Sequence, residues 1–81
     1  MPLGVIAILK VAEGRNVEFE QLAAQLATKV IKNESKCNFY QFNKSREDGQ
    51  TYIAMEQYVD QHAFDAHGKT DYFRSLSKAM G

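Results

Sequence analysis

TYIAMEQYVDQHAFDAHGKTDYFRSL, residues 51–76, is the stretch that decides the fold. Its first part, Thr51–Val59, is rich in β-branched and aromatic residues, which predicts a strand. Asp60 is a good N-cap for a short helix, and we expect Gly68 to close that helix in a C′ position. Thr70 is the N-cap candidate of a second helix. The apolar face of that last helix consists of Phe73, Leu76 and Met80.

The residues before this stretch predict a strand, a long helix and a second strand. Leu3–Val11 is nearly continuous apolar sequence, which is typical of a strand covered on both faces. Asn16 is expected to cap a helix that extends to Lys32. Cys37–Asn43 is aromatic and predicts a strand that forms a hairpin with the strand after it. The apolar face of the long helix would consist of Phe19, Leu22, Ala23, Leu26 and Val30.

The predicted order is therefore strand, helix, strand, strand, helix. This is the order of a split β-α-β unit, the ferredoxin-like α+β sandwich, without its last strand. In that architecture the fourth strand pairs with the first, so its absence leaves Leu3–Val11 as an exposed edge. We therefore expect residues 1–81 to form one domain whose C-terminal strand lies beyond Gly81. Cover by a partner subunit is the alternative.

Length and charge restrict the classes of function. Eighty-one residues suffice for one small domain, and domains of this size often gain stability from oligomerisation. Ten basic and ten acidic side chains cancel, which argues against nucleic acid or an anionic membrane as partner. No apolar run approaches the length of about 18 residues that spans a bilayer. The single cysteine, Cys37, and the lack of a signal-peptide pattern favour the cytoplasm.

Two segments resemble the antibiotic biosynthesis monooxygenase family. One is LGVIAILKVAEGRNVEFEQL, residues 3–22, with an apolar strand, a Gly turn and a helix. The other is YIAMEQYVDQHAFDAHGKTDYFRSL, residues 52–76, and it is the more specific of the two. The resemblance implies a subunit that dimerises sheet to sheet into an α+β barrel, with a pocket between sheet and helices. The matching positions are Glu56, Asp60, Ala63, Phe64, His67, Thr70 and Phe73.

The resemblance also implies a range of activities. Characterised members include cofactor-independent oxygenases of quinols and polyketide phenols, and other members degrade haem or isomerise small molecules. Many members carry a second His where this chain has Tyr72. The haem-degrading members use a Trp and a later His ligand, whereas this chain has no Trp and places Ser77 near the ligand position. We therefore expect no cofactor, and a small aromatic substrate and molecular oxygen as partners.

Three residues are candidates for the chemistry of such an oxygenase, which needs a base, hydrogen-bond donors and a dry pocket. His67 is the candidate base or proton shuttle, although a solvated His favoured by the helix dipole is the alternative. Tyr72 would donate a hydrogen bond to the substrate, or else be structural. Glu56 shares a strand face with Tyr52 and Tyr58. It would orient the base or hold a contact across the subunit interface.

Other chemistries have less support. His62 and His67 are five residues apart, not the three or four that place two ligands on one helical face, so no metal is expected. Cys37 has the pattern of a half-buried strand residue rather than of a nucleophile. The sequence thus predicts a cytoplasmic, homodimeric, cofactor-independent monooxygenase acting on a quinol or polyhydroxylated aromatic. A non-catalytic binding or stress-response module and a small-molecule isomerase are the rival hypotheses.

Overall fold

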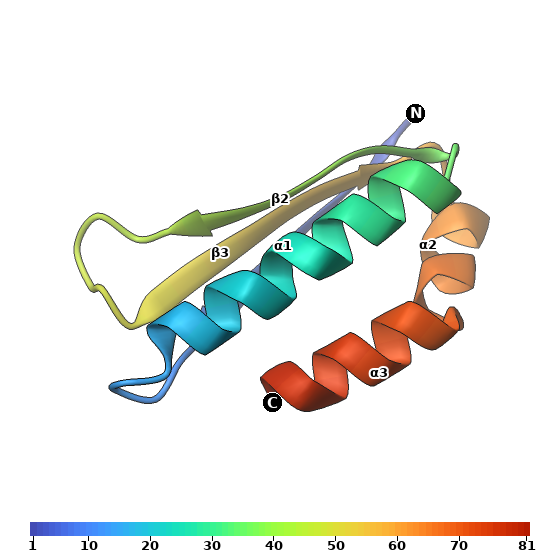
Figure 1. The fold of residues 1–81 in the computed structure, drawn as a ribbon. Coiled ribbons are helices and arrows are strands. Elements are labelled where there is room, and N and C mark those ends of the chain that lie inside the picture. The colour runs from blue at the N-terminus through green and yellow to red at the C-terminus, as the bar shows by residue number, and fades with distance from the viewer.

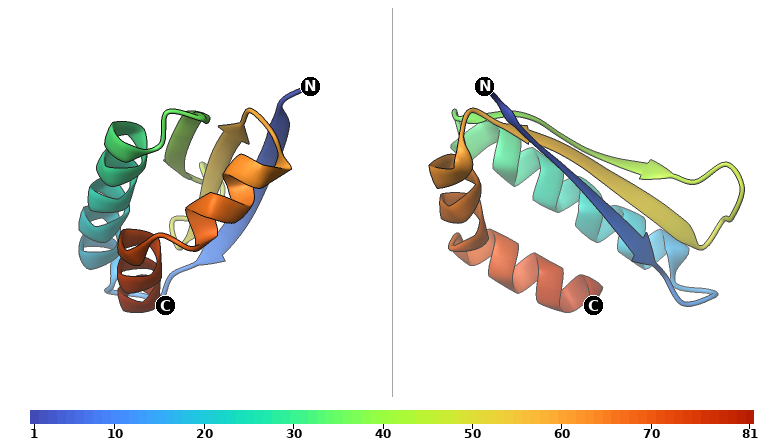
Figure 2. Two further views of the ribbon diagram at one scale, coloured as in Figure 1. Left: turned by 90° about the vertical axis from the view of Figure 1, so that its right-hand side faces the viewer. Right: turned by 180° about the vertical axis from the view of Figure 1, so that it is seen from behind.

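The computed structural model describes residues 1–81, which form an antiparallel sheet covered by helices on one side (Figure 1). The strand order is β1-β3-β2, so the first strand is an edge. Figure 2 shows that the opposite face of the sheet is uncovered. The predicted α+β, ferredoxin-like class is confirmed. The elements are β1 (Leu3–Lys10), α1 (Asn16–Asn33), β2 (Cys37–Lys44), β3 (Thr51–Tyr58), α2 (Gln61–Gly68) and α3 (Asp71–Met80).

The edge strand β1 departs from the prediction of two covered faces. Its side chains alternate, and Val5 and Leu9 pack on the helix side. On the other side Ile6 and Ile8 are 68% and 70% exposed. The prediction of a strand covered on both faces is therefore wrong for the single chain, because no element of the chain lies over the second face.

The core lies between the central strand β3 and helix α1. Every second residue of β3 is buried, as strand alternation requires. Helix α1 buries the face that its helical periodicity predicts, except that Leu22 is only partly buried. Packing of this face holds the C-terminal end of α1 against the start of β2 and against α2. The buried residues of α1 are Phe19, Ala23, Leu26 and Val30.

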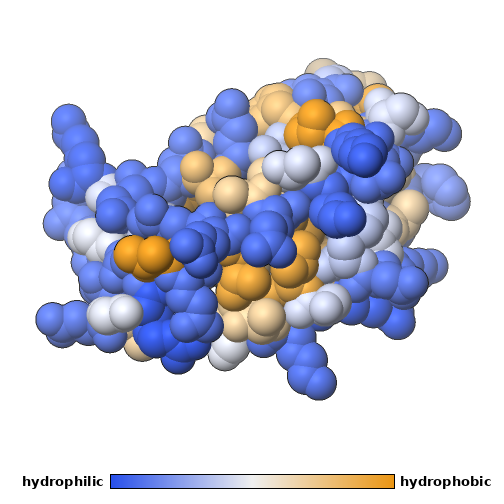
Figure 3. Space-filling view, in the orientation of Figure 1, coloured by the Kyte–Doolittle hydropathy of each residue, from blue (hydrophilic) through white to orange (hydrophobic).

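Helix α3 is less deeply buried than α1. It has no fully buried residue, and it packs on the core through the partly buried Phe73, Leu76 and Met80. Figure 3 shows apolar side chains along the seam between α1 and α3, while most of the surface around them is hydrophilic. None of the three helices combines the length and the apolar character that crossing a lipid bilayer requires.

The two predicted N-caps of the C-terminal helices are confirmed. The Asp60 carboxylate accepts a hydrogen bond from the Ala63 N–H at 2.9 Å. The Thr70 hydroxyl accepts one from the Phe73 N–H at 3.3 Å. Each satisfies a backbone donor that the first helical turn leaves free.

Two other predicted helix ends are wrong. Asn16 is the first residue of α1 rather than its cap, because its side-chain amide donates instead to the Gly49 carbonyl and the Tyr52 hydroxyl. Gly68 is the last residue of α2 and does not have a positive φ. A left-handed C′ residue is unnecessary there, because the backbone N–H and hydroxyl of Thr70 both donate to the carbonyl oxygen of His67.

Candidate functional site

His67 occupies the centre of the candidate site. Its side chain lies in the last turn of α2 and is 2% exposed, so the alternative of a solvated histidine does not hold. Its Nδ1 atom lies 3.1 and 3.0 Å from the two carboxylate oxygens of Glu34. From this contact we assign the Nδ1–H tautomer, in which Nε2 carries the free lone pair. Nε2 is buried and has no hydrogen-bond partner in the protein.

Three aromatic rings enclose the imidazole. The ring centroids of Tyr40, Tyr58 and Phe73 lie 5.2, 5.5 and 4.6 Å from that of His67. They come from β2, β3 and α3, so the enclosure forms only when the helices pack on the sheet. Such a dry environment strengthens electrostatic interactions and excludes water from the nitrogen.

Tyr72 is joined to His67 through Glu34. Its hydroxyl donates to the same Glu34 carboxylate that accepts from the imidazole. Burial, followed by this hydrogen bond and the charge of Glu34, raises the pKa of Tyr72 to about 12. The structure thus brings two of the sequence-predicted residues together around a carboxylate that the sequence did not single out. Glu34 follows α1 directly, as its C-cap residue.

Glu56 lies on the helix-facing side of β3 and is 8% exposed. It accepts a hydrogen bond from the Tyr58 hydroxyl at 2.7 Å, and its cross-strand partner is Tyr40. Burial, together with the charge of Glu56, raises the pKa values of both tyrosines. Glu56 therefore contacts Tyr58 and lies opposite Tyr40, two of the rings that enclose His67. Its side chain faces away from the uncovered side of the sheet.

Cys37 is buried beside the same carboxylates. Its Sγ atom donates to the Phe39 carbonyl oxygen at 3.3 Å. Burial, and then the charges of Glu34 and Glu56, raises the pKa of the thiol to about 11. At neutral pH it is a protonated, poorly nucleophilic thiol. Nowhere in the chain do three or more His, Cys, Asp or Glu side chains lie close enough to hold a metal ion.

Stability is expected to fall at alkaline pH because of Cys37. Its pKa lies above the usual 9.0, at about 11, so the folded state favours the protonated thiol. The resulting stabilisation is complete below pH 9.0 and is lost as the pH rises through about 11. We expect the free energy of unfolding, measured by urea denaturation at a series of pH values, to decline across this interval.

A Cys37→Ala variant provides the control for this decline. Without the thiol, the decline between pH 9 and 11 should be shallower. The part that remains comes from tyrosine, whose pKa is about 10 in the unfolded chain, while the pKa of folded Tyr72 stays at about 12. Coincident profiles for the two proteins would show that Cys37 makes no contribution to the pH dependence.

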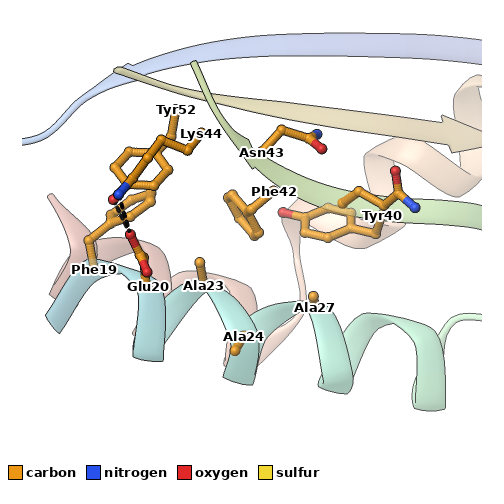
Figure 4. Close-up of a pocket in the computed structure, with 11 residues that line it drawn as sticks. Phe19, Glu20, Ala23, Ala24, Ala27, Tyr40, Phe42, Asn43, Lys44 and Tyr52 are labelled. Atoms are coloured by element: carbon orange, nitrogen blue, oxygen red, sulfur yellow. Dashed lines mark hydrogen bonds and ion pairs between the residues drawn. The ribbon is translucent and has the colours of Figure 1, made fainter. Parts of the chain in front are cut away.

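A groove separates α1 from β2 and has a volume of about 660 Å³ (Figure 4). We call it the α1–β2 groove. Alanines line its helix side, and Tyr40 and Phe42 line its sheet side. At one end the Tyr52 hydroxyl donates to the Glu20 carboxylate, and the Lys44 ammonium lies 3.3 Å from the same carboxylate.

A second groove, of about 690 Å³, lies between the end of α1, α2 and the start of α3. Glu34 and Tyr72 line it, together with the basic side chains Lys29 and Lys36. His67 lines neither groove. Tyr40 lines the α1–β2 groove and also packs on the imidazole, so its ring lies between this groove and His67.

Fold and site together define a ferredoxin-like α+β protein with a buried carboxylate–histidine pair. The sequence profile of the antibiotic biosynthesis monooxygenase family matches residues 2–79, and the chain belongs to this family. This confirms the resemblance that the two sequence segments indicate. No curated protein matches the chain.

Solved structures agree with this assignment. A candidate antibiotic biosynthesis monooxygenase from Caulobacter crescentus CB15 is 40% identical, with a TM-score of 0.96, over 99% of this chain and 76% of that one. Two more distant structures share the fold. A conserved protein from Methanosarcina mazei Go1 is 21% identical, with a TM-score of 0.94, over 99% of this chain and 78% of that one. A candidate antibiotic biosynthesis monooxygenase from Nitrosomonas europaea is 16% identical, with a TM-score of 0.91, over 95% of this chain and 73% of that one.

Proposed function

We propose that the protein is a cofactor-independent monooxygenase that oxidises a quinol or polyhydroxylated aromatic with molecular oxygen. Membership of the family and the similar solved structures support a monooxygenase role in general terms. One observation carries the more specific proposal. His67 is buried, its Nδ1 atom is held by Glu34, and its Nε2 atom is free of any protein partner.

In this mechanism Nε2 of His67 removes a proton from a phenolic hydroxyl of the substrate. The imidazolium that forms is stabilised by the carboxylate of Glu34, which also keeps the ring oriented. The phenolate passes one electron to oxygen, and the two radicals combine to form a peroxide at a ring carbon that carries hydrogen. Loss of water from this peroxide gives the quinone, with the imidazolium returning its proton. Both electrons that reduce the second oxygen atom come from the substrate.

Tyr72 and Glu56 support the base in this proposal. Tyr72 donates its only hydroxyl proton to Glu34, so it fixes the carboxylate that holds His67. It also lines the second groove, where its hydroxyl oxygen would orient a substrate by accepting a hydrogen bond rather than by donating one. Glu56 holds the Tyr58 hydroxyl and, through it, one wall of the imidazole enclosure. The protein would need no metal or flavin for this chemistry. We place it in the cytoplasm, where its lone Cys37 would remain reduced.

Oxygen uptake with a panel of dihydroxynaphthalenes tests the proposal, with quinone formation followed by absorbance. Glu34→Gln removes the charge but keeps the size, and should lower turnover by about 10–100-fold, as expected when the group that orients a histidine is lost. Unchanged turnover in Glu34→Gln would remove Glu34 from the mechanism. Absence of uptake with every quinol would contradict the proposed reaction.

A second candidate function is a non-catalytic small-molecule binding module. A specific observation favours it, since Nε2 of His67 is closed off from both grooves. Such a module would bind the same quinols, measured as quenching of their fluorescence, without consuming oxygen.

We also propose that the protein works as a homodimer whose sheets pack face to face. The uncovered face of the sheet carries apolar side chains from all three strands, and a face of this kind is rarely left to water. Its exposed large apolar residues are Ile6, Ile8, Phe39 and Met55, with exposed fractions of 68%, 70%, 38% and 41%.

A further inference from the structure

The second groove carries an excess of positive charge, although the basic and acidic side chains of the whole chain cancel. Lys29 and Lys36 line it, and neither ammonium group forms an ion pair with a carboxylate. Glu34 is the one acidic residue of the groove, and its carboxylate already accepts from His67 and Tyr72. Two unpaired positive charges beside an occupied carboxylate favour a negatively charged ligand.

The turn between α1 and β2 adds two backbone donors to the same groove. The Cys37 N–H donates to the Glu34 carbonyl oxygen at 3.0 Å, which closes a turn with Ser35 and Lys36 at its centre. The backbone N–H groups of Ser35 and Lys36 have no acceptor in the protein, and both residues line the groove. Successive N–H groups in a turn can bind anionic oxygens, and hydrogen bonds to charged oxygens are the strong ones.

The size of the groove suits more than an inorganic ion. Its volume of about 690 Å³ lies in the range of small-molecule sites. Ala63 and Ala66 line its α2 side and offer small apolar surfaces to the body of a ligand. The helices that form the groove lie on the side of the sheet opposite to the uncovered face, so the proposed sheet-to-sheet dimer does not cover it (Figure 2).

We propose that the second groove binds a small organic acid, whose carboxylate or phosphate group is held by Lys29, Lys36 and the turn between α1 and β2. The apolar body of the acid lies against Ala63 and Ala66. Binding of the acid makes no use of Nε2 of His67, so it is tested separately from the proposed oxidation.

The rival explanation for Lys29 and Lys36 concerns stability alone. A helix carries a partial negative charge at its C-terminal end, and basic side chains near the end of α1 offset this charge. If that is their whole role, their replacement lowers the melting temperature and leaves ligand binding unchanged. The proposed site predicts weaker binding instead.

Isothermal titration calorimetry with phenyl phosphate measures the binding. This compound combines an anionic head with a small apolar body, and it has no phenolic hydroxyl, so it is not oxidised as a quinol. Benzoate presents a carboxylate in place of the phosphate, and benzyl alcohol is the neutral match of both. At least one of the two acids should bind, and the one that binds more tightly identifies the preferred head group. No binding of either acid at millimolar concentration would overturn the proposal, and so would equally tight binding of benzyl alcohol.

The variant Lys29→Gln with Lys36→Gln should weaken binding of the acid by about tenfold or more, because two charge-assisted contacts are lost. Both lysines are exposed, so the variant is expected to fold. Arg46→Gln with Lys78→Gln is the matched control, since it removes the same charge at exposed positions outside the groove. It should bind like the wild type. Unchanged affinity in the first variant, or an equal loss in the control, would overturn the proposal.

Backbone amide signals in NMR spectra locate the bound acid. Those of Ser35, Lys36 and Ala66 should move most during the titration, because these residues line the second groove. The signals of Ala24 and Asn43, in the α1–β2 groove, should stay in place. Shifts concentrated in the α1–β2 groove would contradict the assignment, whatever the outcome of the oxygen-uptake experiments.

Discussion

Replacing His67 with Asn is expected to lower the turnover number of quinol oxidation by about 10²–10⁴-fold, the usual contribution of a positioned general base. The Asn side-chain amide can occupy the place of Nδ1 and still donate to Glu34, which holds His67 at 3.0 Å. Nothing in the variant replaces Nε2, so only the proton acceptor is lost. The measurement is the rate of oxygen uptake at saturating substrate.

His62→Asn is the matched control, because it makes the same replacement on the same helix at an exposed position. It should keep the wild-type rate. Since His67 is only 2% exposed, its replacement leaves a small cavity and should also lower the melting temperature. Retained binding of 1,5-dihydroxynaphthalene under argon would show that the variant keeps an intact site. A His67→Asn protein with at least half of the wild-type rate would contradict the role of His67 as the base.

The double substitution of Ile6 and Ile8 by Glu is expected to separate the proposed dimer into single chains. Both residues point to the uncovered face of β1, where they are 68% and 70% exposed in the single chain. A partner sheet would have to bury both charges in an apolar contact, at a cost of several kcal/mol each. The dissociation constant should therefore rise by about 10³-fold or more. Sedimentation velocity should show the wild type at twice the 9.2 kDa chain mass and the variant at 9.2 kDa.

Gln21→Glu combined with Gln25→Glu is the control for added charge. Both glutamines are exposed on α1, away from the uncovered sheet face. This variant gains the same two negative charges and should remain a dimer. A wild type that sediments as a single chain would rule out the sheet-to-sheet arrangement, and so would a double variant, Ile6→Glu with Ile8→Glu, that stays dimeric.

Local chemistry explains which parts of the fold the sequence predicts correctly. The hairpin and the caps at Asp60 and Thr70 depend on residues within a few positions of one another. The errors arise where distant contacts compete with local preference. The side chain of Asn16 binds groups 33 and 36 residues away instead of its own helix. Similarly, the apolar run of β1 indicates that both faces of the strand are buried. It does not show whether the second face is covered by the same chain or by another one.

The candidate site is predictable only in part for the same reason. The sequence places His67 at a helix end and offers Tyr72 and Glu56 as neighbours. It contains no signal for Glu34, which follows α1 in a short polar break and meets His67 and Tyr72 across 33 and 38 residues. Only the packing of α2 against the end of α1 brings them together. Tyr40 is missed for the same reason, because an aromatic strand residue predicts packing but does not show that its ring will lie against His67.

Turnover under ¹⁸O₂, followed by mass spectrometry of the quinone, tests the central claim most directly. The product is reduced at once, so that its new oxygen atom does not exchange with water. A monooxygenase with His67 as its base should place one ¹⁸O atom in each product molecule, at a rate that falls to background in His67→Asn. A quinone without label, or no product from any dihydroxynaphthalene, would contradict the claim.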